Sequence, residues 1–313
     1  MTSTGGGLQV VVGAGPLGLA VGRQLVSSGK RVRMVNRSGR ADAAERVEVV
    51  AGDVGDPVAT RSLFQGATVV FHCASGPYAR WPQTLPPLMA AIIEGAAGAG
   101  ARVVYGDNMY MYGRPSGPLT EDLPFRPVGP NTRVRAQVAT TLMNAHTSGK
   151  LRATIGRASD FYGPHARQSI VGDGVFDRAL RGRPAQALGD PDALHTYTFI
   201  DDFARGLITL SEHEDALGRV WHVPSAETVT TRRFVQMVFD EVGTPARMRR
   251  VPKLAINVLA LFNPMMRAVS EVLYQSEYPF VVDSSKFAQA FGSHPTPHQE
   301  AIADTVGWFR QHL

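Results

Sequence analysis

Three glycines near the N-terminus, Gly13, Gly15 and Gly18, have the spacing G-x-G-x-x-G within VVVGAGPLGLAVGRQL. The first glycine permits a tight turn, the second lets backbone N–H groups approach a pyrophosphate, and the third lets a helix pack closely on a strand. Glycines at this spacing can also serve packing alone. Because a strand pattern precedes them and a helical pattern follows, whose N-terminus would face the phosphates, the sequence predicts a dinucleotide site that includes Pro16 and Leu17.

The end of the second predicted strand indicates which dinucleotide binds. A site for NAD usually has an acidic residue about 20 residues after the glycines, which holds the ribose 2′-hydroxyl. That place is taken here by Asn36, and Arg37, Ser38 and Arg40 follow it. A guanidinium and a hydroxyl suit a 2′-phosphate through charge-assisted hydrogen bonds. The residues favour NADP(H) over NAD(H), with an ordinary exposed loop arginine as the alternative.

Two polar residues, Asp107 and Asn108, follow the predicted strand at 102–105, where an open α/β sheet binds its ligands. A desolvated carboxylate can act as a general base there, and an amide can hydrogen-bond a carbonyl. Asp107 could instead cap the following turn. We therefore treat both residues as candidates for the reacting centre.

Three tyrosines, Tyr105, Tyr110 and Tyr112, lie in or just after the same strand. Side chains alternate along an extended segment, so Tyr110 and Tyr112 are expected to share one face, opposite Met109 and Met111. Tyr112 fits a core position, and Tyr110 is the better candidate for proton transfer. His72 also ends a predicted strand, but a histidine after an apolar run is more often a core residue.

The helix expected at 132–147 begins with two arginines, Arg133 and Arg135, after a possible cap at Asn131 or Thr132. Cations at a helix N-terminus oppose the helix dipole. Their presence predicts either a nearby acidic partner or a site that needs positive charge.

An aromatic segment containing Tyr78, Arg80 and Trp81 follows the turn CASGP. It is expected to form a loop over the pocket, where Tyr78 and Trp81 could stack on a flat substrate. Such a loop could also simply pack its own aromatic side chains.

Strands and helices must position these residues. Short β-branched runs alternate with amphipathic segments along the sequence, a pattern that is typical of a parallel sheet flanked by helices. Strands are expected at 8–12, 31–35, 47–50, 68–72, 102–105, 152–156 and 219–223. Helices are expected at 16–28, 57–65, 84–98, 132–147, 201–212, 230–242 and 298–311. The predicted fold is α/β, with a doubly wound parallel sheet of 8–164 plus 199–223 that binds the cofactor, and a smaller, discontinuous substrate lobe of 165–198 plus 224–313.

Five ordered segments, spread over residues 8–308, give the chain a family resemblance: VVAGDVGDP, VVFHCASGP, NMYMYG, GRASDFYGP and TYTFIDDFARGL. Together with the glycines, they resemble the motifs of the extended short-chain dehydrogenase/reductases, also called the NAD-dependent epimerase/dehydratase family. The resemblance implies a Rossmann-type fold. It also implies that Asp53 and Val54 hold the adenine ring and that Ala74 and Ser75 lie beside the nicotinamide ribose.

The resemblance also implies a catalytic set of a Ser or Thr with a Tyr and a Lys four residues apart, in which the tyrosine is the general acid/base. Aligning the segments puts Asn108 in the Ser/Thr place, Asn131 in the Tyr place and Arg135 in the Lys place. Asn131 cannot exchange a proton at neutral pH, and an arginine is not an acid in this range. Arg135 is then expected to reach the nicotinamide ribose, while Tyr110 or Asp107 exchanges the proton.

Two functions fit this modified set. One is an NADPH-linked oxidoreductase for a ketone or alcohol of a small, largely apolar molecule. The other is a non-redox cyclase, dehydratase or isomerase, or a cofactor-sensing protein, on the same scaffold. Where the family's nucleotide-sugar enzymes have an Asn and an Arg for a diphosphate, this chain has Asp160 and His195, which disfavours a diphosphate and leaves Asp160 as a substrate contact.

Composition excludes several other classes. The net charge of +5 comes from scattered arginines, which disfavours nucleic-acid binding. A single cysteine, Cys73, and unclustered histidines predict neither a disulfide within the chain nor a metal site. The N-terminal MTSTGGG resembles a floppy leader rather than a signal peptide. The stretch LAINVLALF at 254–262 is too short to span a bilayer; it could rest on a membrane, but we expect a lid or core helix. We expect a cytoplasmic protein with no membrane partner, and the resemblance implies a homodimer through 84–98 and 132–147.

Overall fold

The computed structural model describes residues 7–114 and 116–313; the leader expected at the N-terminus falls mostly on residues 1–6, outside the described residues. The chain divides into two compact units. The sheet unit comprises the residues through Asp107 together with Val134–Arg157 and Ala204–Trp221, and the mixed unit comprises Asn108–Arg133, Ala158–Phe203 and His222–Leu313. The assignment of cofactor binding to one domain and substrate binding to the other stays a prediction.

The sheet unit is built on a seven-stranded sheet of order β11-β6-β5-β4-β1-β2-β3. Its strands are β1 (Leu8–Val12), β2 (Val32–Asn36), β3 (Val47–Ala51), β4 (Ala67–His72), β5 (Arg102–Asp107), β6 (Ala153–Arg157) and β11 (Val220–His222). The pairings from β3 across to β6 are all parallel. The strand order reverses between β1 and β4, which is where a doubly wound sheet binds its ligand. The predicted fold class is confirmed.

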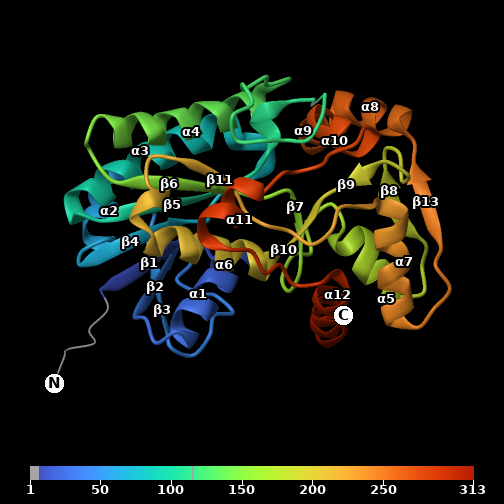
Figure 1. Cartoon of the computed structure of the whole chain (residues 1–313), viewed down its shortest axis with the longest axis horizontal. Helices are drawn as coiled ribbons and strands as arrows, with labels where there is room; N and C mark the ends of the chain where they lie inside the picture. The colour runs from blue at the N-terminus through green and yellow to red at the C-terminus, as the bar shows by residue number, and fades with distance from the viewer. Residues whose placement is uncertain (1–6, 115) are drawn as a thin grey trace. The chain divides into compact units, whose positions relative to one another are not determined.

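Helices cover both faces of this sheet, with α3 and α4 on one side and α1 and α6 on the other (Figure 1). The helices with residues in this unit are α1 (Pro16–Ser27), α2 (Pro57–Leu63), α3 (Trp81–Ala99), α4 (Pro130–Thr147) and α6 (Ile200–Glu212), with the 3-10 helices η1 (Tyr78–Arg80) and η4 (Glu214–Ala216). Trp81 was expected in a loop over the pocket, but it is the first residue of α3. A proline in the first turn fixes a helical φ, so Pro82 favours this earlier start.

Helix α4 begins at Pro130, so neither Asn131 nor Thr132 is the N-cap that the sequence suggested. The hydroxyl of Thr132 accepts the N–H of Gly129 at 2.8 Å and donates to the carbonyl of Gly129 at 2.9 Å. The N–H of Asn131 donates to a carboxylate oxygen of Glu271 at 2.9 Å. Burial raises the pKa of Glu271, while hydrogen bonds from the backbone N–H groups of Asn131 and Thr132 and the charge of Arg133 oppose the shift. Glu271 is therefore an acidic partner at this helix start, as the two arginines required.

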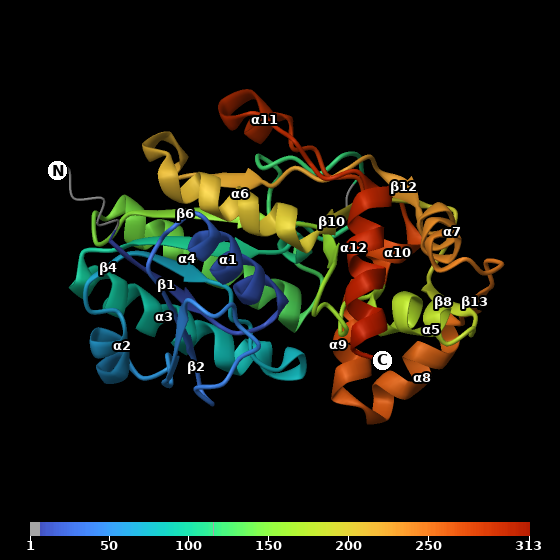
Figure 2. The same cartoon turned by 90° about the horizontal axis from the view of Figure 1, so that it is seen from below.

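The mixed unit consists of short elements around an aromatic core. Its three small sheets pair β10 with β7, β12 with β9 and β13 with β8. The strands are β7 (Asp160–Tyr162), β8 (Ala185–Leu188), β9 (Leu194–His195), β10 (Tyr197–Phe199), β12 (Val229–Thr230) and β13 (Met248–Val251). The helices are η2 (Tyr110–Tyr112), η3 (Gly172–Asp177), α5 (Arg178–Leu180), α7 (Thr231–Val242), α8 (Lys253–Phe262), α9 (Pro264–Val272), α10 (Tyr274–Glu277), α11 (Ser285–Phe291) and α12 (His298–Gln311). Figure 2 shows α8 and α9 side by side, and they are in contact.

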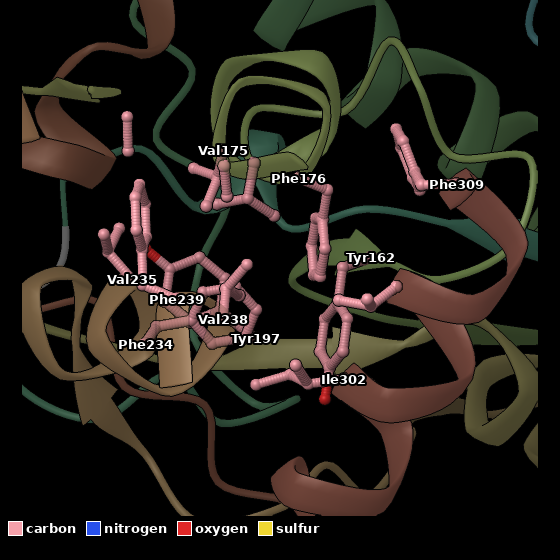
Figure 3. Packing of buried hydrophobic residues seen from close by; sticks show 14 of the residues in the cluster. Tyr162, Val175, Phe176, Tyr197, Phe234, Val235, Val238, Phe239, Ile302 and Phe309 are labelled. Atoms are coloured by element: carbon pink, nitrogen blue, oxygen red, sulfur yellow. The ribbon is translucent and has the colours of Figure 1, made fainter. Parts of the chain in front are cut away.

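The core of the mixed unit gathers buried aromatic rings from several of these elements (Figure 3). The ring of Phe234 lies 4.4 Å from that of Tyr197 and 4.9 Å from that of Tyr162. Both tyrosine hydroxyls find partners, at His298 Nδ1 and at Thr231 Oγ1, each at 2.8 Å. Paired hydroxyls let these rings bury their apolar area without leaving an unsatisfied polar group.

One expectation about an individual segment is wrong, and a second, that 254–262 is a lid or core helix, is reduced to the lid, which stays a prediction. Tyr110 and Tyr112 do not alternate along an extended segment, because they belong to the 3-10 helix η2. The stretch 254–262 is helical as expected but is not a core helix, since Leu261 is 68% exposed and Phe262 is 85% exposed.

Candidate functional site

The glycine loop joins β1 to α1. Gly13 has a φ of +101°, and a Cβ there would lie 3.0 Å from the backbone of Ala74; a Cβ on Gly18 would lie 2.0 Å from the carbonyl oxygen of Gly13. A Cβ on Gly15, in contrast, would meet nothing within 4 Å. The chain's own packing therefore requires Gly13 and Gly18, while Gly15 leaves open space in front of the helix.

The N-terminus of α1 is open to an anion. Its N-cap, Gly15, has no side chain to bond the first amides, and no acidic residue lies in the first turn. Backbone N–H groups at a helix start carry partial positive charge. This loop thus fits the pyrophosphate of a dinucleotide, and the fit depends on backbone groups rather than on side chains.

The loop after β2 is held together by Asn36. Its Oδ1 accepts the N–H groups of Ser38 and Gly39 at 3.0 and 2.7 Å, and its Nδ2 donates to the carbonyl of Arg40 at 2.8 Å. The side chain of Asn36 is therefore used within the loop, and the neighbouring Arg37 is exposed. In the next turn, Asp53 Oδ1 accepts the N–H of Gly55 at 2.9 Å.

A buried charged cluster lies at the carboxyl ends of β5 and β6. Asp107 and Arg157 stand opposite each other in the strand register, with Arg157 Nε 3.2 Å from Asp107 Oδ2. From α4, Arg135 Nη1 lies 3.3 Å from Asp107 Oδ1. All three side chains are almost fully buried. Two guanidinium groups facing one carboxylate leave this cluster with a surplus positive charge.

Arg135 has two further aromatic partners. Its Nη1 donates to the hydroxyl of Tyr105, and its guanidinium carbon lies 4.1 Å from the centre of the Trp81 ring. Trp81 Nε1 donates to the carbonyl of Gly76, and Tyr78 meets the indole edge to face at 4.5 Å. The face of Trp81 is thus used by Arg135, and the proposed stacking on a substrate stays a prediction.

His72 and Tyr105 form a stacked pair next to the charged cluster, with ring centres 4.7 Å apart. Burial, with the charge of Arg135 as a second cause, lowers the pKa of His72 to about 3. Burial also raises the pKa of Tyr105 above its usual value, although Arg135 opposes the shift. Both rings are therefore uncharged at neutral pH. Burial likewise raises the pKa of the adjoining Cys73, so its thiol is a poor nucleophile.

In the mixed unit, the candidates Asn108 and Tyr110 form one local turn, in which Asn108 Oδ1 accepts the N–H of Tyr110 at 3.1 Å. The ring of Tyr110 is half-buried, whereas Tyr112 is buried and its hydroxyl lies 2.8 Å from His222 Nε2. Tyr112 thus has a structural partner, while the half-buried Tyr110 is the more accessible of the two.

Asp160 and His195 form a pair in the same unit. His195 Nε2 lies 3.0 Å from Asp160 Oδ2, and Nδ1 lies 3.1 Å from the carbonyl oxygen of Gln275. An oxygen therefore faces each ring nitrogen, and Nδ1 is placed to donate to the carbonyl of Gln275. This pair was not foreseen, because β7 and β9 are far apart in the sequence. Arg157 was also not identified from the sequence as a site residue. Its position directly after the expected strand at 152–156 was the signal that could have found it.

Residues 7–114 and 116–313 contain no group of three or more His, Cys, Asp or Glu side chains that could hold a metal ion. Within the same residues, no helix has both the length and the apolar character needed to cross a membrane.

The first testable consequence concerns Asp107. Asp107→Asn keeps the shape but removes the negative charge between two buried guanidinium groups, which should lower the free energy of unfolding by about 3–5 kcal/mol. The matched control is Asp192→Asn, which breaks the exposed pair of Asp192 with Arg232 and should change stability little. Urea unfolding of both variants measures the difference. Equal losses of unfolding free energy in the two variants would contradict the prediction.

The second consequence concerns pH. His72 binds a proton in the unfolded chain near pH 6.5 but resists it in the folded protein down to a pKa of about 3. The unfolded state then binds more protons in this window, so stability falls as the pH drops through it. Between pH 7.5 and 5.0, the wild type should lose about 2 kcal/mol more than His72→Gln. Parallel denaturation curves at the two pH values measure this, and identical losses would contradict it.

Comparisons with known proteins agree with the fold and the glycine loop. The family model described as "NAD dependent epimerase/dehydratase family" matches residues 10–223. The mouse (Mus musculus) sterol-4-alpha-carboxylate 3-dehydrogenase, decarboxylating, is 24% identical over 287 residues, which cover 87% of this chain and 78% of that protein.

Two solved structures show the same fold. The dTDP-glucose 4,6-dehydratase from Streptomyces venezuelae, as a double mutant with NAD bound, has a TM-score of 0.79 and 21% identity, over 97% of each chain. The UDP-glucuronic acid 4-epimerase from Bacillus cereus, in complex with NAD, has a TM-score of 0.81 and 18% identity, also over 97% of each chain. With its glycine loop, its sheet order and a family model that spans more than half of its length, this chain belongs to the NAD-dependent epimerase/dehydratase family of enzymes.

Proposed function

We propose that the chain is an NADP(H)-dependent oxidoreductase that acts on a ketone or alcohol of a small, largely apolar molecule. The observation that carries the cofactor choice is the loop after β2. The amide of Asn36 is committed to its own loop, so it offers nothing equivalent to a carboxylate for a ribose 2′-hydroxyl. The exposed Arg37, with Ser38 beside it, suits a 2′-phosphate.

The proposed cofactor site combines this loop with the groups that surround it. The pyrophosphate meets the amides at the start of α1, Asp53 and Val54 lie at the adenine, and Ala74 and Ser75 lie at the nicotinamide ribose. When bound, NADPH supplies the hydride. Arg135 contributes positive charge and orients Tyr105 and Asp107 through the contacts described above.

The proton is assigned to Tyr110 rather than to Asp107. Both carboxylate oxygens of Asp107 face guanidinium groups, and its side chain is fully buried, so it is poorly placed to receive a proton from a substrate. Tyr110 is half-buried and follows Asn108, whose amide is the candidate partner for a substrate carbonyl. In this proposal, Asn108 and Tyr110 together replace the family's Ser and Tyr.

The substrate class follows from charge. Asp160 places a carboxyl group where the family's nucleotide-sugar enzymes have an amide, and its partner His195 is engaged with it at 3.0 Å. A diphosphate would meet this carboxyl group, whereas a neutral carbonyl compound avoids that repulsion. One relative, 24% identical, is named as a sterol-4-alpha-carboxylate 3-dehydrogenase, so a protein similar to this chain is named for a substrate other than a nucleotide sugar.

A non-redox enzyme is the second candidate. The observation that favours it is the replacement of the family's Tyr and Lys by Asn131 and Arg135, which removes the usual proton relay of hydride transfer. Under either function, we retain the proposal that α3 and α4 form a homodimer interface and that the protein is cytoplasmic.

The cofactor assignment predicts that NADPH binds more tightly than NADH. Arg37→Ala should narrow this gap by roughly 1–3 kcal/mol, the range for hydrogen bonds that involve a charged group. Arg31→Ala, immediately before the start of β2 and also exposed, is the matched control and should leave the gap unchanged. Fluorescence titration with both cofactors measures it. A wild type that prefers NADH would refute the choice.

The reaction assignment is tested by NADPH consumption with a panel of apolar ketones. Tyr110→Phe should lower kcat by a factor of about 10²–10⁴, as expected for a lost general acid, without changing NADPH affinity. Tyr278→Phe removes the hydroxyl of another half-buried tyrosine of the mixed unit and should retain activity. If the wild type binds NADPH but never oxidises it, the non-redox alternative is favoured.

A further inference from the structure

Helix α8 exposes the side chains that a helix normally buries. Leu254, Val258 and Leu261 are 74%, 48% and 68% exposed. Their spacing of i, i+4 and i+7 places them on one face of the helix, the pattern of an apolar stripe that faces a protein core. Here Ile256 and Ala260 form the buried side instead. The apolar stripe of α8 therefore points away from the unit to which the helix belongs.

The exposed apolar surface is concentrated in this place. Six of the eleven exposed large apolar residues in the described chain fall within twelve positions. We call them the α8 patch: Leu254, Val258, Leu259, Leu261, Phe262 and Met265. The other five are scattered through the sequence, as is normal for a soluble surface. A contiguous exposed cluster marks an interaction site.

The segment that carries the α8 patch is strongly cationic. Residues 242–270 contain no Asp or Glu, but they contain Arg247, Arg249, Arg250, Lys253 and Arg267. Arg249 and Arg250 are exposed on β13, which leads directly into α8, and no carboxylate of the described residues forms an ion pair with them. Lys253, in contrast, pairs with Glu277 at 2.7 Å.

The positive charges of this segment distinguish between two possible partners of the α8 patch, a second copy of the chain and an anionic membrane. In a two-fold dimer, a patch meets its own copy, so the cationic segment 242–270 would face a second cationic segment with no carboxylate to offset its charge. Anionic lipid headgroups would neutralise them instead, and the acyl boundary would take up the leucine and phenylalanine side chains. At ten residues, α8 can lie in the interface but cannot cross it.

We propose that α8 binds the surface of a membrane that contains anionic lipid, with the α8 patch inserted at the headgroup boundary and Arg249 and Arg250 on the phosphates. This replaces the expectation that the chain has no membrane partner. It does not depend on the proposed oxidoreductase function, because no residue of the cofactor loop or the charged cluster takes part.

The test is co-sedimentation of the full chain with extruded vesicles, either phosphatidylglycerol mixed with phosphatidylcholine or phosphatidylcholine alone. Two double variants probe the two parts of the proposed interaction. Leu261→Glu with Phe262→Glu tests the apolar insertion, and Arg249→Glu with Arg250→Glu tests the contacts with lipid phosphates. The matched control is Val58→Glu with Arg61→Glu on α2, where Val58 is 78% exposed but isolated. Thermal melting followed by circular dichroism verifies that all variants fold, which is expected because every changed residue is exposed.

The wild type and the control should sediment with the anionic vesicles, more weakly at high salt and with neutral vesicles. The Leu261/Phe262 variant and the Arg249/Arg250 variant should each partition into anionic vesicles at least about tenfold more weakly, because one loses apolar insertion and the other loses two lipid-facing cations. Absence of wild-type binding to anionic vesicles at low salt would overturn the proposal, as would unchanged binding of the Leu261/Phe262 variant. If that variant instead converts a dimer to a monomer by light scattering, a second copy of the chain covers α8.

Discussion

The structure of the sheet unit depends on how one buried carboxylate is satisfied. Asp107 ends β5, and its two oxygens face Arg157 from the neighbouring strand and Arg135 from α4. Removing charged groups from water is costly, and only close opposite charges and hydrogen bonds offset that cost. The cluster therefore fixes where α4 lies on its face of the sheet, at the carboxyl ends of β5 and β6. Through Arg135, it also fixes Trp81 at the start of α3 and the hydroxyl of Tyr105.

The same cluster separates residues that hold the fold from residues that can react. His72, Cys73 and Tyr105 lie next to it and have pKa values displaced by burial toward the uncharged form. Such groups neither donate nor accept protons readily at neutral pH. The half-buried Tyr110 and the open space at Gly15 are different, because a ligand could reach them without removing packed side chains.

Most of the fold could be predicted from the sequence because it follows from local periodicity. The strands β1, β3 and β4 and the helices α1 and α12 lie within two residues of their expected bounds, and the glycine spacing indicated the first turn. Local patterns could not reveal which polar residues meet. The pairing of Asp107 with Arg157 depends on strand register, and that of Asp160 with His195 joins segments more than thirty residues apart. The outward stripe of α8 was also hidden, because periodicity shows that a helix has an apolar face but not what that face meets.

The register between Asp107 and Arg157 also constrains how this sequence can diverge. Either arginine could be replaced while Asp107 keeps the other, but loss of the acid would leave two buried cations facing each other across β5, β6 and α4. Descendants of this sequence should therefore lose Asp107 only if both arginines are replaced as well. Substitution is therefore restricted at the carboxyl ends of β5 and β6. It is less restricted at solvent-exposed pairs such as Asp192 with Arg232.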